Sequence, residues 1–193
     1  ELSPMMRQYL DIKAVNEDSI LFFRVGDFYE MFFEDAKTAS EELDLVLTGK
    51  DCGLEERAPM CGVPYHSCEA YIGRLVAKGY KVAVCEQMEN PNETKGIVRR
   101  DIVRTITPGT VIEDTMLDEG VNNYLCAITV SKEDAGICFT DASTGECYAT
   151  TLPTVKTEQH ISNELCRFRP KELLIDASLL KKMPDLSDFL ENN

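Results

Sequence analysis

The stretch FFRVGDFYEMFFED, residues 22–35, decides how the first half of the chain folds. The apolar run SILFFRVG (19–26) overlaps it and ends at a glycine, which is typical of a buried strand. Asp27-x-x-Glu30 then fits a capping box, so we expect a helix from Glu30 to about Asp44. One face of this helix would carry Phe32, Ala36, Ala39 and Leu43.

Phe28, in the middle of this stretch, allows two interpretations. On a helical wheel it lies about 40° from Phe32, which favours burial in the core. If residues 28–30 are extended instead, Phe28 and Glu30 project to the same side. A ring placed in this way can wedge between base steps, and a carboxylate can hydrogen-bond a base edge. Periodicity alone does not choose between the two.

The rest of the first half alternates between strand and helix signals. Ser3-Pro4 predicts a helix to about Asn16, and Ser67 predicts a helix that ends at Gly79. The prolines and glycine of PMCGVPYH (59–66) argue against an ordinary central strand. Further strands are predicted at 45–49, 80–87 and 97–107, the last at a sheet edge. This order predicts a mixed-sheet α/β domain over residues 1–108.

The second half has a different pattern. Residues 109–122 are acidic and rich in turn residues, so we expect a linker there. Three strand-like runs with short turns follow, which predicts an antiparallel meander: YLCAITVS (124–131), AGICFTD (135–141) and ECYATTL (146–152). A helix at about 156–168 and a strand at 172–176 complete the pattern. Residues 123–193 therefore match the opening of a ribonuclease-H-like α/β domain that is incomplete at its C-terminal end.

Composition limits the classes of function. The net charge of −14 argues against nonspecific binding to nucleic acid, and the one locally basic stretch is KGIVRRDIVR (95–104). The eight cysteines form no CxxC pair and only two histidines accompany them, so we expect reduced thiols and no metal site. No apolar run is long enough for a membrane span and no secretory signal is present, which predicts a cytoplasmic protein.

Catalytic signatures are also missing from the sequence. It has no phosphate-binding loop, no dinucleotide fingerprint and no nucleophile elbow. A ribonuclease-H-like nuclease needs carboxylates gathered on its first strand, but 124–131 has none and Asp141 stands alone on the next. His66 and Cys68 are better interpreted as residues at a helix start than as a base and a nucleophile. We therefore expect no catalytic residue, with a metal-dependent hydrolase using Asp141 as the remaining enzymatic alternative.

Several long motifs occur in an order that identifies a family. They are SPMMRQYLDIKAVNEDSILFFRVGDFYEMFFEDAKTAS (3–40), LDLVLTG (43–49), APMCGVPYH (58–66), YIGRLVAKGYKVAVCEQ (71–87) and KGIVRRDIVRTITPGT (95–110). Together they resemble the N-terminal part of the bacterial MutS family of DNA mismatch-repair proteins. The resemblance covers residues 2–110 and continues more weakly to the end of the chain. Because an initiator methionine is also missing, we expect an N-terminal fragment.

The resemblance implies a mode of DNA recognition. The family reads mismatched double-stranded DNA through a Phe-x-Glu motif, which here falls on Phe28 and Glu30. The phenylalanine stacks on the mispaired or unpaired base from the minor groove, the DNA kinks, and the glutamate hydrogen-bonds that base. Lys50 and Arg100 are our candidates for phosphate contacts. The segment around Gly62 is expected to shape and pack the domain rather than to touch DNA.

The resemblance also assigns the second domain and what lies beyond it. The family's connector domain has a ribonuclease-H-like fold without nuclease activity, relays the nucleotide state and is implicated in contacting MutL. The ATPase, which binds ATP and Mg²⁺ and forms the homodimer, would lie beyond Asn193, so no cofactor is expected in this chain. We also expect no membrane partner. The alternative function is a protein–protein interaction fragment that acts mainly through residues 118–193.

Overall fold

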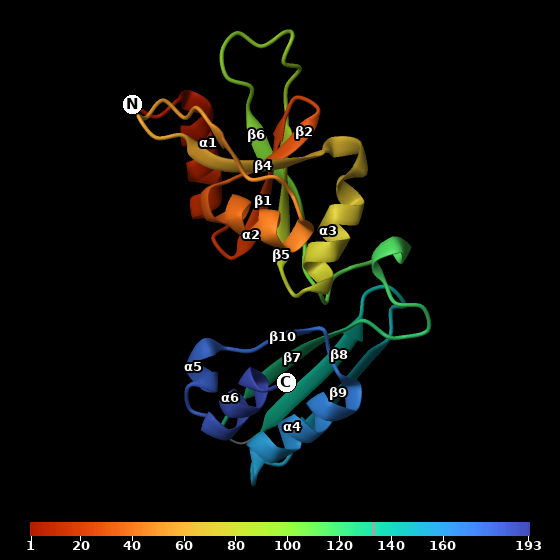
Figure 1. Cartoon of the computed structure of the whole chain (residues 1–193). Helices are drawn as coiled ribbons and strands as arrows, with labels where there is room; N and C mark the ends of the chain where they lie inside the picture. The colour runs from red at the N-terminus through yellow and green to blue at the C-terminus, as the bar shows by residue number, and fades with distance from the viewer. Residues whose placement is uncertain (133) are drawn as a thin grey trace. The chain divides into compact units, whose positions relative to one another are not determined.

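The computed structural model describes residues 1–132 and 134–193. The chain forms two compact units, Glu1–Thr107 and Pro108–Asn193 (Figure 1). The predicted linker, 109–122, falls within the second unit, and its role as a linker stays a prediction. Within the described residues no helix has the length and apolar content that a membrane span requires.

The first unit, all of whose residues are described, is built on a mixed sheet with the strand order β3-β4-β2-β1-β5-β6. The strands are β1 (Ser19–Val25), β2 (Phe28–Phe32), β3 (Thr48–Lys50), β4 (Ala58–Pro64), β5 (Lys81–Gln87) and β6 (Arg100–Ile106). Neighbouring β1 and β5 are parallel, and the other pairs are antiparallel. The predicted edge position of the last strand is confirmed, since β6 ends the sheet.

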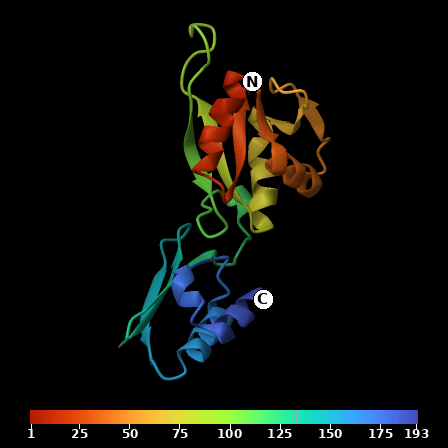
Figure 2. The ribbon, with the colours of Figure 1, turned by 90° about the vertical axis from the view of Figure 1, so that its left-hand side faces the viewer.

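Helices cover both faces of this sheet. They are α1 (Pro4–Ala14), α2 (Phe33–Leu43) and α3 (Cys68–Ala77), the last preceded by the short helix η1 (Tyr65–Ser67). Figure 2 shows α1 on one face and α2 and α3 on the other. Ser3 caps α1 as predicted, accepting a hydrogen bond from the Met6 amide at 3.4 Å. Tyr9 of α1 packs edge-on against Phe23 and Phe32, so this face of the sheet is closed by aromatic contacts.

The segment from Gly26 to Phe32 forms a hairpin, so the predicted capping box at Asp27 and Glu30 is wrong. Gly26 has a φ of 58° in the turn, and β2 then pairs with β1 on one side and β4 on the other. This pairing satisfies the backbone of residues 28–32 in an extended form, and α2 begins only at Phe33. The predicted apolar face of the helix is nevertheless buried: Phe32, Ala36, Ala39 and Leu43.

The segment PMCGVPYH also differs from its prediction. Residues 58–64 form β4, which lies between β3 and β2 rather than at an edge. Pro59 is the second residue of β4 and Pro64 the last, so the residues between them keep their amide donors for pairing. Ser67 precedes α3 as predicted, but its hydroxyl donates to the Pro64 carbonyl at 3.3 Å instead of capping the helix.

The described residues of the second unit form a sheet with the strand order β10-β7-β8-β9. The strands are β7 (Tyr124–Val130), β8 (Ala135–Asp141), β9 (Cys147–Leu152) and β10 (Glu172–Leu174). The predicted antiparallel meander is confirmed, and β10 joins β7 in parallel. The predicted turn KEDAG (132–136) contains Glu133, which lies outside the described residues.

Three helices of the described residues pack on this second sheet: α4 (Thr157–Phe168), which was predicted, α5 (Ala177–Leu180) and α6 (Pro184–Glu191). The short helix η2 (Asp114–Met116) precedes β7 in the chain. The core contains Ile128 and Phe139 from the sheet, Ile161 from α4 and Leu186 from α6. Both units have a mixed sheet with packed helices, which confirms the predicted α/β class. In the second unit, the meander β7-β8-β9, helix α4 and strand β10 form the predicted opening of a ribonuclease-H-like fold.

Candidate nucleic-acid interface

Phe28 is an exposed ring at the start of β2. Its side chain is 47% exposed, whereas Phe22, Phe23 and Phe32 are fully buried. Alternation along β2 directs Tyr29 and Met31 into the core on one face and places Phe28, Glu30 and Phe32 on the other. On that second face Tyr9 of α1 covers Phe32, whereas Phe28 at the start of the strand stays exposed. Of the two interpretations that the sequence left open, the extended one is therefore correct.

The register of the sheet fixes what surrounds Phe28 and Glu30. Phe28 lies opposite Pro64 on β4, and Glu30 lies opposite Gly62. A Cβ atom added at Gly62 would be 3.7 Å from Phe28 Cδ1 and 3.7 Å from Glu30 Cγ. Both side chains thus lean over the glycine, which leaves room for a ring and a carboxylate to stand side by side.

Lys50, the last residue of β3, makes an ion pair with Glu30. Its Nζ donates to Glu30 Oε2, and the two side chains are 27% and 13% exposed. The ammonium also lies 5.8 Å from the centre of the Phe32 ring. The structure therefore places this predicted phosphate contact on the same face as Phe28, with its charge directed at Glu30.

Arg100, the first residue of β6, lies on the same face but is held by other groups. Its Nε donates to the Arg24 carbonyl at 2.7 Å, and Nη1 donates to Gln8 Oε1 at 3.0 Å. The guanidinium lies 4.8 Å from the centre of the Phe23 ring. Burial lowers the pKa of Arg100, and the nearby Cys85 and Glu30 act in the opposite direction. Arg100 thus links β6, β1 and α1 beneath the candidate interface.

A group that sequence reasoning missed braces the turn before Phe28. The Arg24 guanidinium lies 3.8 Å from the centre of the Tyr65 ring and pairs with Glu86 at 3.5 Å. The Tyr65 amide donates to the Asp27 carbonyl at 2.9 Å. Arg24 was detectable as a charge at the end of an otherwise apolar strand, but its partners on η1 and β5 are distant in sequence. The brace fixes the direction in which β2 leaves the turn.

The second unit offers no comparable chemistry in its described residues. Asp141 is buried and accepts hydrogen bonds from the Asn123 amide at 2.9 Å and from Ser143 Oγ at 2.6 Å. Burial raises its pKa, but hydrogen bonds from Ser143 and Asn123 outweigh that effect and hold the pKa below its usual value. In residues 1–132 and 134–193 no group of three or more His, Cys, Asp or Glu side chains could hold a metal ion. Asp141 is thus suited to fixing a turn.

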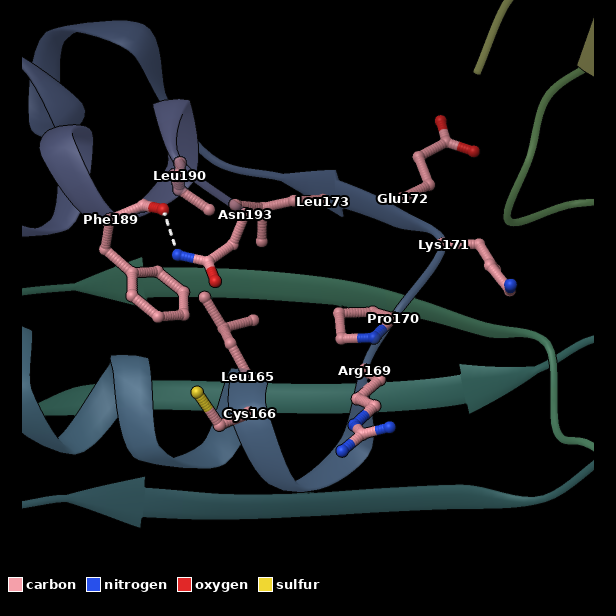
Figure 3. Close-up of a pocket in the computed structure, with 10 residues that line it drawn as sticks. All are labelled: Leu165, Cys166, Arg169, Pro170, Lys171, Glu172, Leu173, Phe189, Leu190 and Asn193. Atoms are coloured by element: carbon pink, nitrogen blue, oxygen red, sulfur yellow. Dashed lines mark hydrogen bonds between the residues drawn. The ribbon is translucent and has the colours of Figure 1, made fainter. Parts of the chain in front are cut away.

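The second unit also has a pocket with an apolar floor and a charged rim (Figure 3). Leu165, Leu173 and Leu190 contribute to the floor, while Arg169 and Lys171 lie toward the rim. Asn193 Nδ2 donates to the Phe189 carbonyl at 2.8 Å at one side of it. No group of three or more His, Cys, Asp or Glu side chains that could hold a metal ion lies among the described residues of its lining.

Comparisons with known proteins match both halves of the chain to one family. A family model described as MutS domain I matches residues 3–115, and one described as MutS domain II matches residues 123–192. The chain is 50% identical over 192 residues to the DNA mismatch repair protein MutS of Caldanaerobacter subterraneus subsp. tengcongensis. This alignment covers 100% of this chain and 22% of that protein. It is 54% identical over 187 residues to the protein of that name from Clostridium tetani, covering 95% of this chain and 21% of the relative. The chain thus spans about a fifth of the length of these relatives. As the motifs of its first half indicated, the chain belongs to the MutS family.

Proposed function

We propose that this chain recognises mismatched base pairs in DNA mismatch repair, with Phe28 as the wedge and Glu30 as the base contact. The observation that carries the proposal is the exposed Phe28 ring beside the Glu30 carboxylate on one sheet face. Both residues stand on β2, which is paired on each side, so the ring is presented by a rigid element. The MutS relatives, whose names state a role in mismatch repair, support the same function.

Selectivity would come from the cost of deforming the duplex. A ring that wedges into a base step must unstack it, and a mismatched step is stacked and paired less well than a matched one. The same ring therefore enters a mismatch at a lower cost. A carboxylate beside it repels the DNA backbone everywhere and gains a hydrogen bond only where a base donor becomes accessible. Phe28 and Glu30 would thus act together, the first by deformation and the second by discrimination.

The acidic character of the chain fits a probe rather than a clamp. With a net charge of −14, tight binding to phosphates cannot come from the whole surface. In the full-length protein, other domains would hold the duplex, bind ATP and form the homodimer. We propose that this protein acts in the cytoplasm. Lys50 and Arg100 remain candidates for phosphate contacts, although in the free chain both are engaged with protein groups.

The test compares two aromatic rings of similar exposure. Phe28→Ala in the full-length MutS protein that carries this chain should reduce preference for a G·T duplex by about tenfold or more, the usual value of one base–aromatic stack. Tyr148→Ala is the matched control, since Tyr148 is 49% exposed but lies in the second unit. Fluorescence anisotropy with matched and G·T duplexes measures both. A Phe28→Ala protein that keeps the wild-type preference would show that the wedge assignment is wrong.

We also propose that the second unit contacts MutL. The supporting observation is the pocket beside β10, whose apolar floor and charged rim are typical of a protein-docking surface (Figure 3). Mixing this chain with MutL at high concentration and measuring complex formation by sedimentation tests the idea. Lys171→Glu, at the rim, should weaken the complex, and Lys78→Glu in the first unit is the control. The absence of any complex would count against this second role.

A further inference from the structure

The pairing of Glu30 with Lys50 spans two strands that are not neighbours. The strand order places β4 between β3 and β2. On β4, Gly62 lies opposite Glu30 and Ala58 lies opposite Lys50. Since these two β4 residues are four apart, they share one face of the sheet. Lys50 therefore extends across β4 on this face to reach the carboxylate.

The path across β4 is suited to a lysine side chain. Ala58 and Gly62 at its two ends are small, the apolar Met60 lies between them on the same face, and the ammonium lies 5.8 Å from the centre of the Phe32 ring. A lysine stem can cover apolar surface of this kind while its ammonium reaches a polar partner. The resulting ion pair is well covered, with Glu30 13% exposed. A carboxylate covered to this degree is costly to leave without a partner.

The other cation near Glu30 does not provide this partner. Arg100 directs its guanidinium to the Arg24 carbonyl, to Gln8 and to the Val98 carbonyl. Its role is to join strands and helix beneath the interface. Lys50 thus supplies the direct ion pair with Glu30 and decides where that carboxylate stands relative to Phe28.

We propose that Lys50 is a positioning residue for mismatch recognition, which holds Glu30 over Gly62 so that the carboxylate faces the base beside the wedge. The inference rests on the proposed function of Phe28 and Glu30 and assigns Lys50 a role different from a phosphate contact. With Oε2 held by Lys50, the other carboxylate oxygen accepts the hydrogen bond from the base. Lys50 also offsets the charge of Glu30, so the acid can approach the duplex at a lower electrostatic cost.

The two roles of Lys50 have different signatures. A phosphate contact acts on every duplex alike and contributes about one unit to the slope of log affinity against log salt. A positioning residue acts through Glu30, so its loss changes the ratio of affinities for mismatched and matched DNA. That change disappears when Glu30 has already been removed, because the two effects are then not additive.

The experiment is a double-mutant cycle in the full-length MutS protein that carries this chain. Lys50→Met should lower the G·T preference by about fivefold and leave the salt slope unchanged, whereas Lys50→Arg should retain most of the preference. In a Glu30→Ala background, Lys50→Met should have no further effect on the preference. Lys78→Met is the matched control, because Lys78 pairs with Glu42 at 2.5 Å on the exposed surface of the first unit.

The outcomes separate this inference from the function on which it rests. An equal loss of affinity for both duplexes, a smaller salt slope and persistence in the Glu30→Ala background would overturn the positioning role and restore the phosphate contact. If Phe28→Ala and Glu30→Ala leave the G·T preference intact, the proposed function itself has failed. Thermal unfolding of each variant identifies any loss of binding that comes from misfolding, and for folded variants the effect of Lys50→Met in the Glu30→Ala background decides the role.

Discussion

Phe28 in the first unit and Tyr148 in the second are exposed to similar degrees, 47% and 49%, but their surroundings differ. Tyr148 packs against the rings of Tyr124 and Phe168, with ring centres 6.4 and 5.8 Å apart. Phe28 leans over Gly62 and stands beside a carboxylate. The two rings therefore differ in their neighbours and not in their exposed fraction, and the proposed binding role of Phe28 rests on those neighbours.

The two units use carboxylates in equally different ways. Asp141 accepts hydrogen bonds from amides and a hydroxyl within its own turn region, which is a rigid local arrangement. Glu30 is held by a flexible lysine from a strand that does not adjoin its own. If the Asp141 carboxylate left its hydrogen-bond donors, the turn would lose its structure. The Glu30 carboxylate, held by a flexible lysine, can accept a hydrogen bond from a new partner while the strand keeps its structure. The second arrangement suits a group that must test a ligand.

The largest effect that tests this comparison is the difference in stability between two phenylalanine variants. Phe23→Ala should lower the free energy of unfolding of the first unit by about 3–5 kcal/mol, because the ring is fully buried against Tyr9. Phe28→Ala should change it by less than about 1 kcal/mol, because the ring is half exposed. Hydrogen exchange of peptides from residues 1–107 measures both. Similar losses in the two variants would place Phe28 in the core.

The next effect concerns Asp141 and depends on pH. Asp141→Asn should destabilise the second unit by about 1–3 kcal/mol at neutral pH, since the charged acceptor of several hydrogen bonds is lost. Because folding lowers the pKa of Asp141, its contribution is present above the unfolded pKa and is lost as the pH falls through the folded pKa.

The difference between wild type and Asp141→Asn should therefore shrink in acid. Hydrogen exchange of residues 134–193 across an acid titration checks the sign. A constant difference at all pH values would show that the stabilisation does not depend on the charge. A metal-dependent nuclease activity that Asp141→Asn removes would revive the hydrolase alternative.

How far the fold could be predicted depended on whether pairing is local. The meander of β7, β8 and β9 was predictable because each strand pairs with the next along the chain across a short turn. The segment 27–32 was not, because Asp27-x-x-Glu30 carries the same residue types as a capping box. Two pairings together select the extended form: the local hairpin with β1, and β4, some thirty residues further on, which local pattern does not indicate.

The candidate site shows the same limit. The resemblance to a family pointed to Phe28 and Glu30, and the exposure of the ring supports that choice. The ion pair with Lys50 joins residues twenty positions apart across a strand between them, which no local pattern could indicate. The brace of Arg24 and Tyr65 likewise depends on the fold of β4 and η1.

A smaller effect should follow removal of the Glu30 charge. Glu30→Ala should lower the G·T preference while tightening binding to matched DNA by about threefold, because one negative charge near the backbone is removed. Glu34→Ala is the control, since Glu34 is an exposed acid on α2 that pairs with Lys37 at 2.6 Å. Titrations of a matched duplex measure both variants. Equal tightening in the two would mean that net charge, and not the position of Glu30, sets the affinity.

The smallest predicted effect tests whether Gly62 provides the room that the site needs. A methyl group at Gly62 would crowd the Tyr29 carbonyl at 3.2 Å and touch Phe28 and Glu30 at an ordinary contact distance of 3.7 Å. Gly62→Ala should therefore displace β2 slightly, and the two side chains with it. Stability should change by less than about 1 kcal/mol, since the reduced freedom of the unfolded chain offsets the crowding. The G·T preference should fall by about twofold to threefold. Gly136→Ala on β8 is the control, because its methyl group would also meet an atom at 3.2 Å, on Thr129, far along the chain from Phe28. If both variants lower the preference equally, or neither does, the space above Gly62 does not set the geometry of the wedge.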